Sequence, residues 1–263
     1  MKRLISILAT IATACTMPGC RTDDGSEFNP TLAGYTHFEY IDTFVAGQLP
    51  VVRKLLLFDL YLAAESEEER MQIHNEHFYT FRIFEQEGLW HIVSSNTELI
   101  IDTGGSLLAD EGATWAFRYA DEKYDTDDMP TIANNGTSDE TDATRYALHI
   151  PSLADLLLDI TPKNTTSEGT KTSLRFDTYI SGGGRLTVDY GSNRLNTTVM
   201  MFEATEPVHT SDPSISWFNS GAWSVRAVAS GITDVFEARY IGSKKVMITC
   251  NGVSREYYYT DRY

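Results

Sequence analysis

A two-residue alternation of apolar and polar side chains begins after Phe78 and continues through most of the chain. Successive side chains of a β-strand point to opposite faces, so this alternation predicts strands that each bury one face. In the first half of the chain it covers residues 79–85, 89–94, 97–102 and 113–119. Glu-Gly, Ser-Asn and Asp-Thr-Gly-Gly turn signals separate these segments. The short spacings between them suit an antiparallel meander.

The second half of the chain repeats this pattern. Alternating segments at 174–178 and 186–190 flank Gly182-Gly183-Gly184, which predicts a hairpin turned by the glycines. Further strands are predicted at 198–204, 222–229, 232–241, 245–250 and 255–260. Ser-Gly, Gly-Ser and Asn-Gly pairs supply the turns between the last four of them.

Helical patterns precede the first strand. Pro50 suits a first helical turn, and the apolar residues after it recur at spacings of three and four, which predicts a helix to about Ala64. The segment 66–69, Ser-Glu-Glu-Glu, has the features of a capping box and predicts a second helix that ends near Asn75. A Ser-x-x-Asp start and a Leu-Leu-Leu run predict one more short helix at 152–160.

An aperiodic stretch rich in Asp, Asn and Gly, residues 121–145, divides the chain as an acidic loop or a junction. We therefore expect a helix pair with a β-meander lobe at 35–120 and a second β-rich lobe at 146–263, as one domain or two. The fold class predicted is α+β and predominantly antiparallel β, in meander or sandwich-like lobes with one or two short N-terminal helices.

The first residues have the layout of an export signal. Lys2 and Arg3 provide a positive start, and the apolar run 4–14 that follows is too short to cross a hydrocarbon core of about 30 Å. The end of this signal resembles a bacterial lipoprotein box, in which a small residue precedes the cysteine that is lipidated and becomes the mature N-terminus. Both Cys15, after Ala14, and Cys20, after Gly19, meet that description.

The residues after Cys20 favour it over Cys15 as the lipidated cysteine. Segment 21–27, Arg-Thr-Asp-Asp-Gly-Ser-Glu, is similar to the acidic tether of many surface lipoproteins of the Bacteroidota. This resemblance implies a signal peptide at 1–19, a lipidated cysteine with a polar tether at 20–34, and attachment to a membrane through the lipid. It also implies a location at the outer membrane or cell surface, with the periplasmic face as the alternative.

Acidic residues outnumber basic ones by 37 to 21, which gives a formal net charge of -16. Removal of residues 1–19 would take away Lys2 and Arg3, leaving 19 basic residues and a net charge of -18. Nucleic-acid phosphates are bound by Lys and Arg, so this composition argues against a nucleic-acid partner. With Cys20 lipidated, Cys250 is the only thiol left and no intrachain disulfide is expected.

The segment 99–106, Leu-Ile-Ile-Asp-Thr-Gly-Gly-Ser, resembles the apolar-apolar-Asp-Thr-Gly motif of aspartic peptidases. In that family two such aspartates share a proton, and the resemblance would make Asp102 catalytic. Gly105 departs from the residue usual after the motif, and the chain has no second Asp-Thr-Gly. The interpretation favoured is a turn that Asp102 caps through its own backbone.

Two further patterns contain metal-ligand side chains. His74 and His77 share a helix face, but no third ligand is identifiable. The acidic stretch 125–142 offers oxygen ligands without the ordered spacing of a calcium loop. Surface histidines and a solvated charge run are favoured, so no metal site and no cofactor are predicted.

Aromatic residues supply the candidate binding site. Trp217 lies near a turn-rich stretch with Trp223 close by, and exposed rings there could stack on sugars. The sequence thus predicts a cell-envelope lipoprotein that acts as a binding or structural module, for a glycan or an envelope protein. The alternative is a hydrolase, either an aspartic peptidase using Asp102 or a glycosidase with unrecognised carboxylates. No catalytic residue is assigned.

Overall fold

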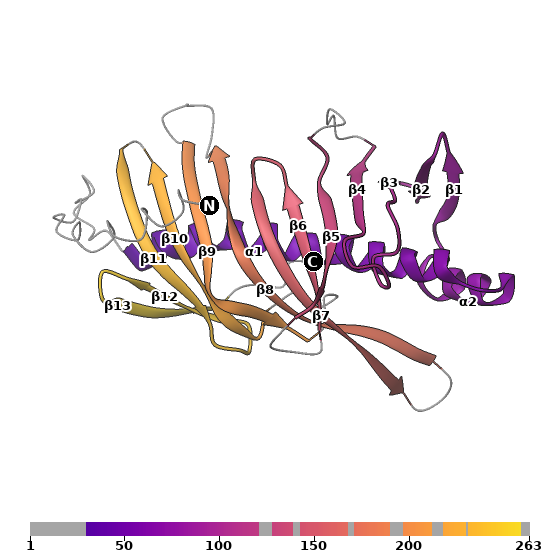
Figure 1. Cartoon of the computed structure of the whole chain (residues 1–263). Helices are drawn as coiled ribbons and strands as arrows, with labels where there is room; N and C mark the ends of the chain where they lie inside the picture. Colours follow the sequence, from indigo (N-terminus) through magenta and orange to yellow (C-terminus); the bar gives the residue numbers. More distant parts are fainter. Residues whose placement is uncertain are drawn as a thin grey trace.

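A computed structural model of the chain describes residues 30–120, 128–138, 143–167, 171–189, 197–211, 218–229 and 231–258. Within them the chain forms two helices followed by thirteen strands (Figure 1). The helices are α1, Pro30–Ala63, and α2, Glu67–His77. The strands are β1 Arg82–Gln86, β2 Leu89–Val93, β3 Glu98–Asp102, β4 Thr114–Tyr119, β5 Thr131–Thr137, β6 Thr144–Ile150, β7 Ala154–Ser167, β8 Lys171–Asp189, β9 Thr197–Thr210, β10 Ser220–Ala229, β11 Ile232–Tyr240, β12 Lys245–Cys250 and β13 Val253–Tyr258.

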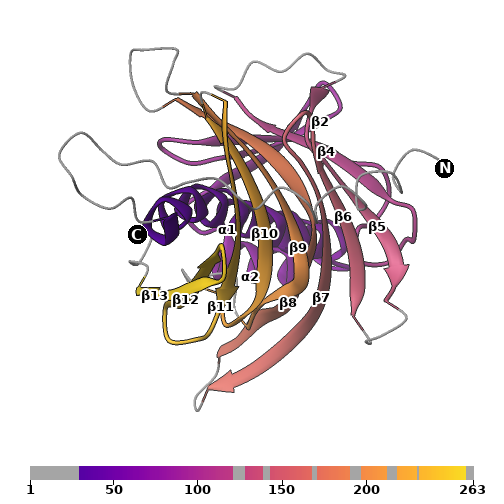
Figure 2. The same cartoon turned by 90° about the vertical axis from the view of Figure 1, so that its left-hand side faces the viewer.

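The strands form one antiparallel sheet in which every strand pairs with its neighbours in the sequence. This meander confirms the predicted fold class. Helix α1 lies along one face of the sheet and crosses its strands, and the sheet curls around the helix (Figure 2). We call the face turned toward α1 the inner face and the opposite one the outer face.

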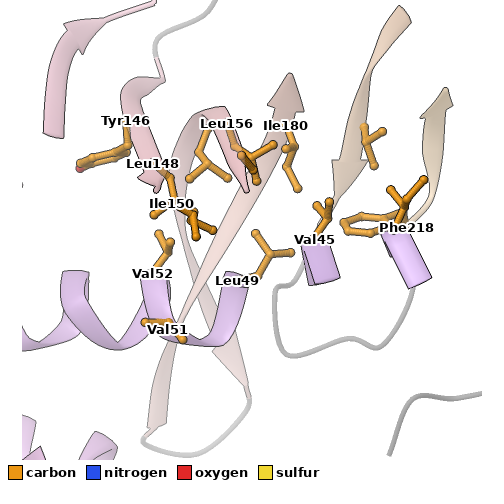
Figure 3. Packing of buried hydrophobic residues seen from close by; sticks show 14 of the residues in the cluster. Val45, Leu49, Val51, Val52, Tyr146, Leu148, Ile150, Leu156, Ile180 and Phe218 are labelled. Carbon is orange, nitrogen blue, oxygen red and sulfur yellow. The ribbon is translucent and has the colours of Figure 1, made fainter. Parts of the chain in front are cut away.

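The core fills the space between α1 and the inner face. Val45, Leu49 and Val52 recur at helical spacing and are at most 4% exposed. They face Leu148, Leu156, Ile180 and other buried side chains of the sheet (Figure 3). In the part of the chain that the structure describes, neither helix combines the length and apolarity needed to cross a membrane.

Helix α1 starts much earlier than predicted. The prediction of a first turn at Pro50, and of a polar tether that continues to residue 34, is wrong, because α1 begins at Pro30 and includes Pro50 in its interior. Proline lacks an N–H and usually breaks a helix. Here Pro50 is exposed while Leu49 and Val51 beside it are buried. Packing on the sheet therefore keeps the helix continuous past the proline.

Helix α2 begins as its sequence predicts. The Ser66 hydroxyl accepts a hydrogen bond from the backbone N of Glu69 at 3.1 Å, and the Glu69 carboxylate accepts one from the backbone N of Glu65 at 3.0 Å. The first bond satisfies an N–H group that the first helical turn leaves without a partner, and the second ties the residue before the cap to the helix.

The predicted short helix at 152–160 is wrong, since residues 154–167 form β7. Its Leu-Leu-Leu run alternates between the two faces: Leu156 and Leu158 are buried, while Leu157 is 36% exposed. Burial of every second residue is the pattern of a strand, and the pairing of β7 with β6 and β8 overrides the helical signal.

The predicted glycine turn at 182–184 is also wrong, because β8 runs straight through it. A Cβ on Gly183 would collide with the backbone oxygen of Phe202, and one on Gly184 with that of Leu153. Gly182 has φ +89° and adjoins a shift of register between β8 and β9. The glycines therefore permit close strand approach and a bulge.

The predicted junction 121–145 contains strand β5, which is hydrogen-bonded to both β4 and β6. Asn134, counted in the acidic stretch, is only 4% exposed, and its Nδ2 donates a hydrogen bond of 2.7 Å to the carbonyl of Leu107. Residues 121–127 and 139–142 lie outside the described part of the chain.

The start of α1 is joined to the last strand of the sheet. Tyr35 stacks on Tyr257 with ring centroids 4.6 Å apart, and its hydroxyl donates a hydrogen bond of 2.9 Å to the carbonyl of Tyr258. Tyr258 itself is 69% exposed, as expected for a residue on the face opposite Tyr257. The N-terminal end of the folded part therefore lies beside β13.

Candidate functional site

The tryptophans proposed from the sequence do not form a surface site in the described residues. Trp223 is fully buried, and its Nε1 donates a hydrogen bond of 3.2 Å to the hydroxyl of Tyr240. Its ring belongs to the core and offers no surface on which a sugar could stack. Trp217, Cys15 and Cys20 lie outside the residues that the structure describes.

Asp102 is exposed at the end of β3, next to the predicted turn. The turn is capped by other aspartates. Asp110 accepts a hydrogen bond of 2.8 Å from the backbone N of Ser106, and Asp59 of α1 accepts one of 2.7 Å from the backbone N of Leu108. These contacts give the Asp-Thr-Gly-Gly-Ser segment a structural role between β3 and β4.

The two histidines of α2 have separate partners. His74 Nε2 lies 3.0 Å from the carbonyl of Phe81, and His77 Nε2 lies 3.9 Å from a Glu76 carboxylate oxygen. Among the described residues there is no group of three or more His, Cys, Asp or Glu side chains arranged to hold a metal ion.

The space between helix and sheet is filled. A cavity between α1 and β7–β8, bordered by Leu49, Val52 and Phe176, has a volume of about 10 Å³, room for no more than one water molecule. Larger ligand-binding features lie on the outer face of the sheet.

Four residues form a row across β6 to β9 on the outer face. Arg145 pairs with Asp159, Asp159 with Tyr179, and Tyr179 with His209, each directly across adjacent strands. With Asp177 they constitute what we call the Tyr179 row. Their neighbours along the strands, such as Tyr146, Leu158 and Thr178, are buried on the inner face. Strand alternation therefore places the whole row on the outside.

One half of the Tyr179 row is an arginine–aspartate pair. Arg145 donates two hydrogen bonds to Asp159, from Nε to Oδ1 at 2.7 Å and from Nη2 to Oδ2 at 2.8 Å. The same Nη2 donates to the hydroxyl of Ser138 at 3.1 Å. A two-point contact of this kind holds both planar groups in a fixed orientation.

The other half contains the aromatic ring. Tyr179 is 41% exposed and stacks on the His209 imidazole with ring centroids 4.5 Å apart. His209 Nε2 donates a hydrogen bond of 2.6 Å to Asp177 Oδ1, because a carboxylate can only accept. The imidazole is held by this bond and in turn supports the phenol ring.

A hollow of about 240 Å³ lies further along the same strands, and we call it the glycine pocket. Gly183 and Gly184 contribute backbone alone to its wall, and its polar side chains are His149, Ser152, Asp155 and Arg185. His149 Nδ1 donates a hydrogen bond of 2.6 Å to Asp155 Oδ1. The hollow exists because close strand approach forbids side chains at the glycines.

Serine, histidine and aspartate are the residue types of a nucleophilic triad, and all three border the glycine pocket. The His149–Asp155 bond is present, but no hydrogen bond joins Ser152 to His149, both of which the structure describes. Asp155 is 84% exposed, so it lacks the buried position of an orienting carboxylate. The triad is not assembled.

The Tyr179 row is not among the sites predicted from the sequence, although the sequence carries one signal for it. The alternation in 174–178 predicts that Asp177 and Tyr179 share a face opposite Phe176 and Thr178. The partners Asp159 and His209 depend on the register of β7 and β9 with β8, which no local pattern specifies.

Comparison of the chain with protein-family models, with curated proteins and with solved structures finds no match.

Proposed function

We propose that the chain is a lipid-anchored protein of the cell envelope whose outer sheet face binds glycans through the Tyr179 row. The observation that carries the proposal is the exposed Tyr179 ring, held between a fixed arginine–aspartate pair on one side and a fixed histidine–aspartate pair on the other. A glycan is also the ligand expected from the sequence, and Tyr179 takes the place of the predicted pair Trp217 and Trp223 as its site.

A pyranose ring presents C–H groups on its faces and hydroxyls around its edge. Tyr179 provides an aromatic surface for such a face, as well as a phenol group that can exchange hydrogen bonds. Asp159 lies beside it on the next strand as an acceptor, and Arg145, paired with Asp159 on the strand after that, is a donor. Because both pairs are already joined by short hydrogen bonds, little side-chain entropy is lost when a ligand binds.

Binding is favoured over hydrolysis at this row. A glycosidase needs one carboxylic acid that donates a proton and one carboxylate that attacks or activates water. Asp159 accepts hydrogen bonds from Arg145 and Ser138, and Asp177 accepts one from His209. Both aspartates are therefore used as acceptors that position the row.

The proposed lipid on Cys20 would tether the molecule by the end of α1 that lies beside β13. Residues 20–29 span at most about 35 Å when fully extended. The row lies on β6–β9, several strands away from β13 in the meander, so the anchored end of the folded part does not lie beside it. The acidic body, with a net charge of -18 once residues 1–19 are removed, also argues against nucleic acid as the ligand.

The test is binding of the chain carrying Cys20→Ser, expressed without residues 1–19, to an immobilised panel of plant, host and bacterial oligosaccharides. We expect saturable binding to a subset of the panel, and we expect Tyr179→Ala to weaken it by tenfold or more, on the order of 1.4 kcal/mol.

Tyr258→Ala is the matched control, because Tyr258 is an exposed tyrosine of the same sheet at 69% exposure and lies outside the row. It should bind as the unsubstituted chain does. Equal loss in both variants, or no binding to any member of the panel, would contradict the proposal.

A further inference from the structure

We infer that the glycine pocket is a second subsite of the same glycan site and that it takes a carboxylate-bearing sugar, such as a uronic acid. This inference rests on the proposed function and names the class of ligand. Three observations support it. The pocket lies on the same face as the Tyr179 row, its glycines keep it open, and the guanidinium of Arg185 has no partner among the residues that the structure describes.

The pocket and the Tyr179 row lie on one face of the sheet. Asp155 borders the pocket, and Asp159 belongs to the row on the same strand, β7. At 3.3 Å per residue the two positions are about 13 Å apart, which is longer than one sugar ring. A ligand that touches both must therefore be an oligosaccharide.

The glycines make the pocket a permanent feature of the fold. A Cβ on Gly183 would collide with the backbone oxygen of Phe202, and one on Gly184 with that of Leu153, so neither position accepts a larger residue that could fill the hollow. Leu153, which is 38% exposed, forms an apolar part of the wall. A sugar ring can enter with its polar edge toward His149 and Arg185.

Arg185 gives the pocket its charge preference. Its guanidinium forms no hydrogen bond or ion pair with any other residue that the structure describes, and it is exposed at the edge of the pocket. Asp155, the carboxylate of the pocket, is already joined to His149 at 2.6 Å. A guanidinium binds a carboxylate through two parallel hydrogen bonds, so Arg185 can pair with one carboxylate of a ligand.

His149 adds an acceptor for a sugar hydroxyl. Because Nδ1 donates to Asp155, Nε2 of the neutral ring carries no proton and can accept. With one arginine available, the pocket matches a group of a single negative charge. A phosphate, which carries a charge of about -1.5 to -2 at neutral pH, would need a second cation.

The test uses isothermal titration of the same Cys20→Ser chain with three probes of equal length: trigalacturonic acid, its methyl ester and maltotriose. The acid should bind at least tenfold more tightly than the ester. Arg185→Gln should remove that difference and leave the affinity for the ester unchanged.

Arg226→Gln is the control for overall charge, since Arg226 is an exposed arginine of β10 on the outer face and does not border the pocket. It should preserve the preference for the acid. Equal affinity of the unsubstituted chain for acid and ester, or equal loss in both arginine variants, would overturn the carboxylate subsite and leave the Tyr179 row standing. No binding of any of the three probes would overturn the subsite, and the oligosaccharide panel would then decide the proposed function on its own.

Discussion

The hydroxyl of Tyr240 on β11 donates a hydrogen bond of 2.6 Å to Oδ1 of Asp42 on α1, joining residues 198 positions apart. Asp42 is only 2% exposed, and the same hydroxyl accepts a hydrogen bond from Trp223. A buried carboxylate requires such partners, because its desolvation is costly. Helix α1 can therefore reach its final state only when the C-terminal part of the sheet is in place.

Tyr240→Phe removes this hydrogen bond while keeping the ring. We expect a loss of about 1.5–3 kcal/mol in the free energy of unfolding, the range for hydrogen bonds to charged groups, measured by urea denaturation. Tyr79→Phe serves as control, because Tyr79 is 76% exposed. A Tyr240→Phe midpoint equal to that of the control would show that the bond does not stabilise the fold.

Two glycines of α1 test how closely the helix packs on the sheet. A Cβ on Gly34 would lie 2.9 Å from Cγ2 of the buried Ile248, whereas nothing lies within 4 Å of a Cβ on Gly47. Gly47→Ala should stabilise the protein by about 0.5–1 kcal/mol through helix propensity. Gly34→Ala should destabilise it by about 1 kcal/mol, because overpacking outweighs that gain. Thermal unfolding shows whether each variant is more or less stable than the unsubstituted chain. Stabilisation of both variants would contradict the close packing of Gly34 on the sheet.

Histidine protonation should lower stability in mildly acidic solution. Burial lowers the pKa of His37 and of His77 below the ordinary value of 6.5, partly offset at His37 by Asp234. The unfolded chain then binds more protons than the folded one. The stability that the neutral rings contribute is therefore present above about pH 6.5 and lost as the pH falls below it.

We expect the free energy of unfolding to fall between about pH 7.5 and about pH 5.5, and the His37→Gln, His77→Gln double variant to show a smaller fall. Burial raises the pKa of Asp59 above 3.8, so protonation of Asp59 on acidification favours the folded chain and opposes the effect of the histidines. Urea titrations at both pH values make the comparison. If the free energy of unfolding falls equally in the double variant and in the unsubstituted chain, the two histidines are not the cause of the fall.

Lipidation is predicted at Cys20. Mass spectrometry of the mature N-terminus from a diderm host should find an acylated Cys20, and Cys20→Ala should abolish the modification while Cys15→Ala keeps it. Acyl chains on Cys15 would move the cleavage site to residue 14. An unmodified N-terminus in both variants and in the unsubstituted chain would contradict the anchor.

The sheet was predictable where the signals are local. Lys245–Cys250 was predicted to the residue, because alternation in the strand ends at an Asn251-Gly252 turn whose residues have φ +53° and +77°. The first half of α1 was not, because its start coincides with polar and glycine residues and its buried face is recognisable only against the completed sheet. Gly183 is predicted in a turn for the same reason. The contact that requires a glycine there is with the backbone of Phe202 on the next strand, which the local sequence does not reveal.

Binding of a glycan to the outer face of β6–β9 can be located residue by residue in solution. The most direct measurement is a chemical-shift map of the ¹⁵N-labelled Cys20→Ser chain, titrated with an oligosaccharide that the panel identifies. We expect Tyr179→Ala to abolish the shifts, the largest of which should fall on Arg145, Asp159, Asp177, Tyr179 and His209. Shifts confined to residues outside β6–β9, such as β13 or α2, would contradict it.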